Sequence, residues 1–107
     1  MASTYKILGQ TTGSLSDTNL YTVPSGSTAV LSTIVVCNTT GSALTYRLAA
    51  IPSGSTLANK HYIAYETAIA SNDTTALTLG ITLGSEDKLN IYGSGSLSFS
   101  VFGSQLS

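Results

Sequence analysis

The sequence predicts an all-β protein, a single antiparallel β-sandwich of jelly-roll or Ig-like type, with about eight short strands and a short N-terminal arm. Three observations support this fold class. Apolar and polar residues alternate with a period of two along most of the 107 residues. Gly, Pro, Ser or Asn interrupts the alternation at intervals of about 8–12 residues, which is typical of sandwiches and barrels. No segment shows the spacing of an amphipathic helix.

The first expected strand spans about residues 4–10, and a polar linker that ends at Asp17 follows it. We therefore expect residues 1–17 to form an N-terminal strand and flexible linker arm, and residues 18–107 to form the sandwich domain. Such an arm can fold back on its own sandwich, or it can add a strand to the open edge of a neighbouring molecule.

A repeated turn punctuates the next strands. The letters PSGST occupy residues 24–28 after an expected strand at 20–23, and they return at residues 52–56 after an expected strand at 44–51. Neither copy has the lysine or the following helix that a phosphate loop needs. The similarity between the two regions also ends after five letters. We interpret the pair as one turn used twice, in which Gly supplies a positive φ.

The long strand expected at 28–38 is apolar on both faces if its residues alternate strictly. The two faces are Ala29, Leu31, Val35 and Cys37 on one side, and Val30, Ile34 and Val36 on the other. An antiparallel strand with one wet face normally shows polar residues on that face. The outer face is therefore expected to be covered, either by a loop or arm of this chain or by another subunit.

The remaining strands alternate more regularly, at about 60–69, 77–83, 88–92 and 97–101. Strict alternation in the first of these places His61 and Tyr65 on one face and Tyr62 on the other. Tyr62 and Tyr92 are expected to point away from the core. Exposed aromatic residues occur both in sugar-binding platforms and in protein interfaces. The absence of Trp from the chain favours packing at an interface.

Composition excludes several classes of partner. Only 8% of the residues are charged, against about 25% in ordinary soluble proteins, and the net charge is −1. We therefore expect neither nucleic acid nor an anionic membrane as a partner. No apolar run approaches a membrane span, and the N-terminus lacks the pattern of a signal peptide. A surface so poor in charge is typical of a protein that neighbours cover or that works outside cells.

Catalytic chemistry is not indicated. His61 is the single histidine and Cys37 the single cysteine, so a Ser-His-Asp or Cys-His site would have to use His61. That histidine fits an ordinary strand pattern, and Cys37 is expected to be a small buried residue. The acidic residues are scattered, and no spacing is typical of a metal site. We expect no enzyme, no cofactor and no metal.

Several stretches together carry a family resemblance along nearly the whole chain. They are YKILGQ, LYTVPSGSTAVLSTIVVCN, LANKHYIAYE, NDTTALTLGITL and the closing FSVFGSQ. In this order and combination the sequence resembles small virion structural proteins of tailed bacteriophages. The resemblance implies a non-enzymatic β-sandwich that binds other virion proteins and lies in a virion assembled in the host cytoplasm. The resemblance assigns no residue of this chain a catalytic role.

Within that resemblance, a compact domain without a shaft favours a capsid decoration (cement) protein. Such a protein stabilises the shell by binding the major capsid protein, and cement proteins commonly form homotrimers. The alternatives are a tail, neck or baseplate component and, from another class, a secreted glycan-binding module. The candidate contact residues are Tyr5, Ile7, Leu8, Val30, Ile34, Val36, Tyr62 and Tyr92.

Overall fold

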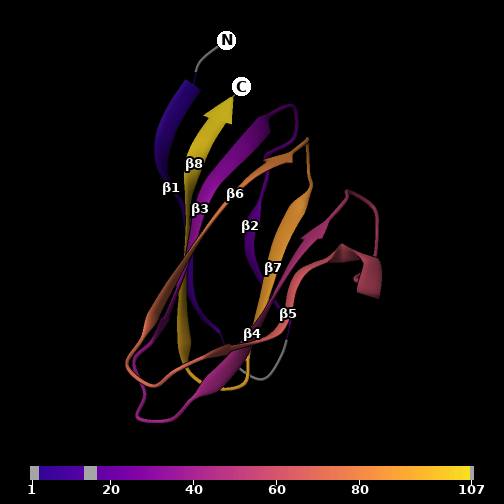
Figure 1. Ribbon diagram of the computed structural model, residues 1–107. Coiled ribbons are helices and arrows are strands. Elements are labelled where there is room, and N and C mark those ends of the chain that lie inside the picture. The colour runs from indigo at the N-terminus through magenta and orange to yellow at the C-terminus, as the bar shows by residue number, and fades with distance from the viewer. Residues whose placement is uncertain (1–2, 14–16, 107) are drawn as a thin grey trace.

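The computed structural model describes residues 3–13 and 17–106 (Figure 1). Within them, eight strands form two antiparallel four-stranded sheets, which confirms the predicted β-sandwich. A short 3-10 turn, η1 (Asn59–His61), precedes the fifth strand. The strands are β1 (Ser3–Gly13), β2 (Thr18–Thr22), β3 (Thr28–Asn38), β4 (Leu44–Ile51), β5 (Tyr62–Ile69), β6 (Thr74–Leu83), β7 (Lys88–Gly93) and β8 (Leu97–Leu106).

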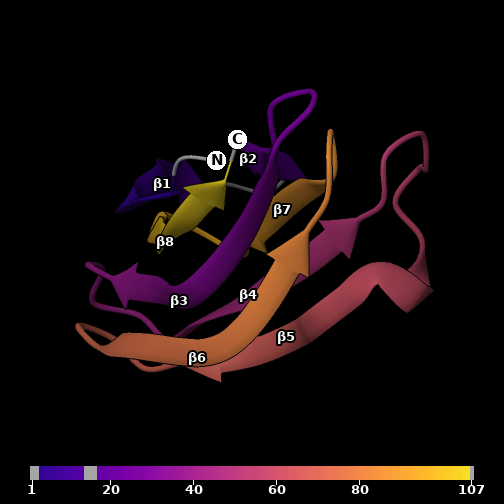
Figure 2. The ribbon, with the colours of Figure 1, turned by 90° about the horizontal axis from the view of Figure 1, so that it is seen from above.

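The strand order identifies the sandwich as a jelly roll. The first sheet has the order β1–β8–β3–β6 and the second the order β2–β7–β4–β5. The paired strands therefore include β1 with β8, β3 with β6, β2 with β7, and β4 with β5. The same pairs form when one long antiparallel ribbon is rolled up. The edge strands β6 and β5 lie along the same side of the sandwich (Figure 2).

Alternating residues of both sheets fill the space between them. The core includes Phe99 and Val101 from the first sheet, and Leu48 and Ile91 from the second, all at most 1% exposed. Burying each such side chain contributes about 1.5–3 kcal/mol. The hydrophobic pattern therefore holds the two layers together, as the sequence predicts.

The first strand pairs within its own chain. β1 runs antiparallel to β8 from Ser3, opposite Leu106, to Gly13, opposite Leu97. The sequence allowed this segment to pair either with its own sandwich or with a neighbouring molecule. In the structure it pairs with its own sandwich. Its register shifts once, just after Ile7.

A β-bulge in β3 corrects the assignment of the candidate residues Ile34 and Val36. The register of β3 against β8 shifts between Leu31 and Thr33, so Ser32 is an extra residue. An extra residue reverses which later side chains face inward. Ile34 and Val36 consequently share the inner face with Leu31 and are buried in the core, where they cannot serve as contact residues.

The outer face of β3 consequently carries a different set of residues from the one expected. Val30 is 36% exposed, whereas Val35 and Cys37 are half-buried on the outside of the sheet. Cys37 is therefore not a core residue, and its sulfur accepts a hydrogen bond from the Thr74 hydroxyl at 3.5 Å.

The repeated PSGST segment forms the same turn twice. The Ser27 N–H donates to the Pro24 carbonyl at 3.1 Å, and the Ser55 N–H donates to the Pro52 carbonyl at 3.0 Å. The central glycines have φ values of 83° and 79°. These values lie in the left-handed region that Gly adopts readily, so the predicted turn is confirmed.

Both PSGST turns are held by the connection between β6 and β7. The Gly26 N–H donates to the Ser85 hydroxyl at 2.9 Å, and the Ser53 N–H donates to the Asp87 carboxylate at 2.7 Å. The other carboxylate oxygen of Asp87 accepts from the Gly84 N–H at 2.8 Å. Three turns that lie far apart in the sequence thus close one end of the sandwich.

His61 lies in the 3-10 turn and not in the expected strand, because β5 begins only at Tyr62. The imidazole is mostly buried, and its Nδ1 accepts a hydrogen bond from the Ala58 N–H at 3.0 Å. This contact closes the turn locally.

The bulge in β3 yields a stability prediction at Gly103 of β8, which lies opposite Leu31 of β3. A Cβ at Gly103 would overlap the Val30 carbonyl oxygen of the adjacent strand. We expect Gly103→Ala to lower the free energy of unfolding by about 2–3 kcal/mol in urea denaturation. Gly41→Ala is the control, because a Cβ there meets nothing within 4 Å. Equal stability of the two variants would contradict the close approach.

A candidate binding surface on the second sheet

Tyrosine rings gather around the chain's single arginine on the outer face of the second sheet. Arg47 of β4 is directly opposite Tyr92 of β7. Its guanidinium carbon lies 4.2 Å from the centroid of the Tyr92 ring and 4.6 Å from that of Tyr65. Tyr62 meets Tyr65 edge to face, with 4.8 Å between centroids and 72° between planes. We call Arg47, Tyr62, Tyr65, Glu66 and Tyr92 the tyrosine–arginine patch.

A bulge in β5 brings two of these residues to the same partner. The register between β4 and β5 shifts between Tyr46 and Leu48, so Tyr65 and Glu66 together lie opposite Arg47. Glu66 has a φ of 49°, in the left-handed region that residues other than Gly adopt uncommonly. Strict alternation would place the two neighbouring side chains on opposite faces. This bulge therefore brings Tyr65 and Glu66 together at Arg47, and a second register shift, between Leu48 and Ala49, brings Tyr62 opposite Ala49 on the same outer face.

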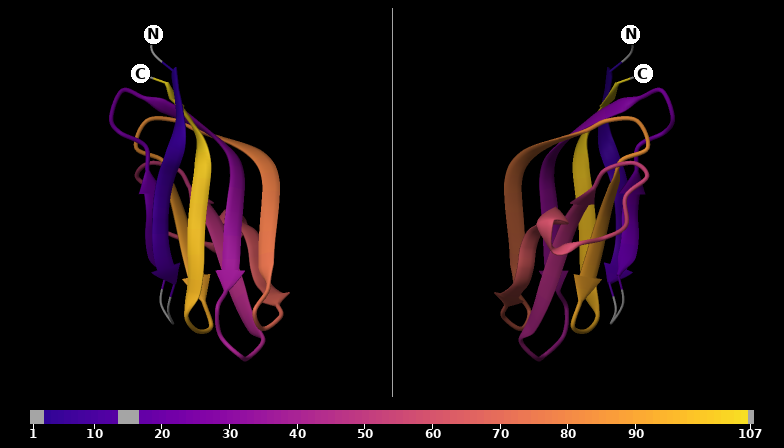
Figure 3. Two further views of the ribbon diagram at one scale, coloured as in Figure 1. Left: turned by 90° about the vertical axis from the view of Figure 1, so that its left-hand side faces the viewer. Right: turned by 90° about the vertical axis from the view of Figure 1, so that its right-hand side faces the viewer.

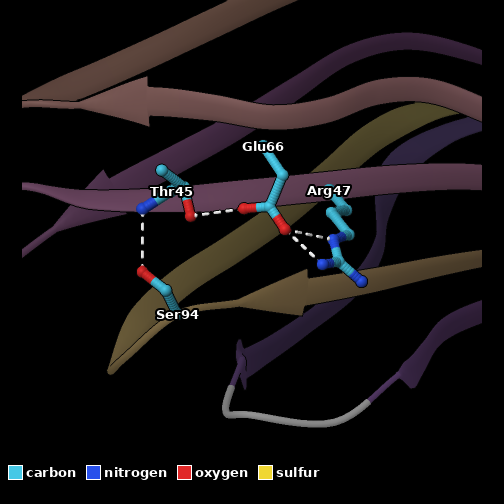
Figure 4. A network of polar contacts seen from close by, with 4 residues as sticks. All are labelled: Thr45, Arg47, Glu66 and Ser94. Atoms are coloured by element: carbon cyan, nitrogen blue, oxygen red, sulfur yellow. Dashed lines mark hydrogen bonds and ion pairs between the residues drawn. The ribbon is translucent and has the colours of Figure 1, made fainter.

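Glu66 is the centre of a polar network (Figure 4). One of its carboxylate oxygens accepts a hydrogen bond from Arg47 Nε at 2.8 Å and another from a terminal nitrogen of the same guanidinium. The other oxygen accepts from the Thr45 hydroxyl at 2.8 Å. The Thr45 N–H in turn donates to the Ser94 hydroxyl at 2.8 Å, which ties the network to the segment between β7 and β8.

Hydrogen bonding changes the pKa values of both charged groups. The bonds from Arg47 and then from Thr45 hold the pKa of Glu66 below its ordinary value. The bond to Glu66 is the main cause that raises the pKa of Arg47. Both groups are therefore charged at neutral pH and offset each other. A surface ion pair contributes little to stability, so its main effect is to hold the guanidinium against the tyrosine rings.

A hollow of about 330 Å³ lies beside the patch, lined by Asn59, Tyr62 and Tyr65. The connection between β4 and β5 contains the 3-10 turn and runs across the outside of the sandwich (Figure 3). Asn59 in this turn is one of the residues that line the hollow. Ala49 and Ile51 point toward the same outer face as Arg47, yet they are only 1% and 3% exposed. The outer face at this end of β4 is therefore covered by this chain.

Amide groups extend the polar surface toward the opposite edge of the sheet. Asn90, two residues before Tyr92 in β7, donates to the Asp17 carboxylate at 2.8 Å. Its amide oxygen accepts from the Asn19 side chain at 3.1 Å. The second sheet thus presents carboxylates, amides, a guanidinium and aromatic rings on one face.

The predicted contact residues are divided between different places. Tyr62 and Tyr92 come together on the patch through Arg47. Ile7 is 52% exposed and lies with Val30 on the other sheet, whereas Leu8 is half-buried against the core. The remaining candidate, Tyr5, pairs with Ser104 through its backbone, and its side chain lies outside the described part of the chain.

Sequence reasoning missed three members of the patch, namely Arg47, Tyr65 and Glu66. One signal was available, because a single arginine in a chain so poor in charge is unusual. The bulge that gathers the three residues carries no glycine or proline, so the sequence pattern gave no sign of it.

In the described residues, no group of three or more His, Cys, Asp or Glu side chains is arranged to hold a metal ion. Among those residues, no helix is long and apolar enough to cross a membrane.

The sequence matches no protein-family model and no curated protein. Solved structures resemble its fold. A chain in the structure of infectious bursal disease virus strain Gx superposes with a TM-score of 0.55 at 13% identity, over 97% of this chain. A chain of strain Gt superposes with a TM-score of 0.51 at 13% identity, over 96%. The match spans only 31% of each of those longer chains, and at this identity the likeness concerns the fold.

The network around Glu66 predicts a pH response. We expect NMR titration to give Glu66 a pKa below the ordinary value of about 4.3, and Arg47→Met to raise it toward that value. Lys6→Met, in the first sheet, is the control and should leave the Glu66 pKa unchanged. Because the pKa is lower in the folded state, the ion pair stabilises the fold above about pH 4.3, and this contribution is lost as the pH falls through the folded pKa. An unchanged Glu66 pKa in Arg47→Met would contradict the network.

Proposed function

We propose that this chain is a non-enzymatic structural protein of a virus particle. The observation that carries the proposal is the likeness of nearly the whole chain to part of longer chains in virus structures. The jelly-roll order of the strands supports it, since this architecture is frequent in viral capsid domains.

The more specific proposal is a cement protein that binds the major capsid protein of a tailed phage, as a homotrimer. Its support is the sequence resemblance to small phage virion proteins and the low charge of the chain. Three linked copies would strengthen weak individual contacts through effective concentration. A tail, neck or baseplate position is the alternative within the same particle.

The outer face of the first sheet is the proposed shell-binding surface. Its outward residues include Ile7, Val30, Val35 and Phe102, with serines along β8 between them. Among the described outward strand positions of this sheet, none is charged. The centres of protein interfaces are likewise depleted of charged residues. The opposite sheet carries the tyrosine–arginine patch, so the two outer faces differ in chemistry.

The position in the particle can be measured directly. We expect mass spectrometry of separated heads and tails to find the protein in heads, at a copy number of hundreds per particle. Detection in tails alone, at about a dozen copies or fewer, would contradict the cement role. The mass of the purified protein in solution tests the trimer.

A charge placed on the shell-binding surface should weaken attachment. We expect Val35→Lys to reduce binding to shells that lack the protein by at least about tenfold, because a lysine would be buried without a partner. Thr56→Lys, in the exposed connection before β5, is the matched control and should bind normally. Equal loss of binding in both variants, or in neither, would argue against this surface.

A further inference from the structure

The hollow beside the tyrosine–arginine patch is a corner built from two aromatic rings and an amide. The rings of Tyr62 and Tyr65 stand at 72° to each other, and Asn59 completes the lining. Arg47 lies over the Tyr65 ring, yet Tyr65 remains 54% exposed. The volume of about 330 Å³ lies near the lower end of the usual range for ligand sites, roughly 300–1,000 Å³. The corner therefore suits a small ligand that combines an apolar face with polar edges.

Contacts within the chain hold the side chains of the patch in place. Glu66 is bonded on both carboxylate oxygens, by Arg47 and by Thr45, and Arg47 is held against Tyr65 and Tyr92. Fixing the side chains in advance reduces the entropy cost of binding. The charges of Arg47 and Glu66 also offset each other. The corner is consequently polar but close to neutral, which disfavours phosphate and other strongly anionic ligands.

We propose that this hollow binds a neutral hexopyranose. The apolar C–H face of such a sugar packs against the Tyr65 ring, whose face carries partial negative charge. The sugar hydroxyls are both donors and acceptors, and the Asn59 amide and the Tyr62 hydroxyl offer both functions. This site lies on the second sheet and goes beyond the proposed structural role. A particle that binds the chain through the first sheet would leave the sugar site facing outward.

The ligand class can be tested on the purified chain by NMR titration. The probes are methyl β-D-galactopyranoside, methyl β-D-glucopyranoside and methyl α-D-mannopyranoside, added one at a time. We expect at least one of them to shift amide signals of residues 59–66 and of Arg47, with a dissociation constant on the order of 1–10 mM. Methyl β-D-glucuronide is the charged comparison, because Lys60 lies in the same turn, and it should bind no more tightly.

Variants measure how much the Tyr65 ring contributes to glycoside binding, separately from the rest of the surface. Tyr65→Ala should weaken binding of the responding glycoside by about tenfold, whereas Tyr65→Phe should keep it within about threefold, because the ring remains. Ile63→Ala changes an exposed residue of the same strand outside the hollow and should bind like the unmodified chain.

Several results would overturn the sugar site. They are the absence of shifts with all three neutral glycosides, shifts confined to other parts of the chain, an unaltered affinity in Tyr65→Ala, and tighter binding of the glucuronide. Loss of shell binding in Tyr65→Ala, together with no response to any glycoside, would assign the patch to a protein partner instead. Since the titration uses the isolated chain, its failure leaves the proposed shell contact standing.

Discussion

The close approach of β3 to Gly103 of β8 is the constraint on which the first sheet depends. The extra residue Ser32 lies at this point, and its hydroxyl donates to the Phe102 carbonyl at 3.2 Å. Because Gly103 has no side chain, the backbone of β3 can pass close to it. The resulting shift turns Ile34 and Val36 into the core and leaves the outer face to other residues. A single irregularity thus decides both the packing of the sandwich and the surface that it presents.

A second irregularity organises the other sheet. The bulge at Glu66 places two successive residues of β5 opposite Arg47, and the guanidinium then links tyrosines from two strands. Bulges also blunt an edge strand against pairing with other chains, and β5 is an edge of its sheet. The same feature therefore shapes the patch and interrupts the regular edge.

The two outer faces of the sandwich have different chemistry. One is uncharged at its described outward strand positions and rich in hydroxyl groups, while the other gathers an ion pair, amides and aromatic rings. A jelly roll keeps these faces apart because each belongs to a different sheet. A chain that packs against a shell through the first sheet can therefore carry a second binding activity on the other. This separation is the physical basis for testing the proposed shell contact and the proposed sugar site independently.

The sequence by itself determined the fold class, the approximate strand positions and the repeated turn. These features follow from local causes: the period of two, the punctuation between strands and the conformational freedom of Gly26 and Gly54. It also indicated that Tyr62 and Tyr92 face outward. Only the tertiary structure decided the jelly-roll order, the return of β1 onto β8 and the membership of the patch. Each depends on register between strands distant in sequence, and one bulge, invisible in the pattern of residues, reverses every side chain beyond it.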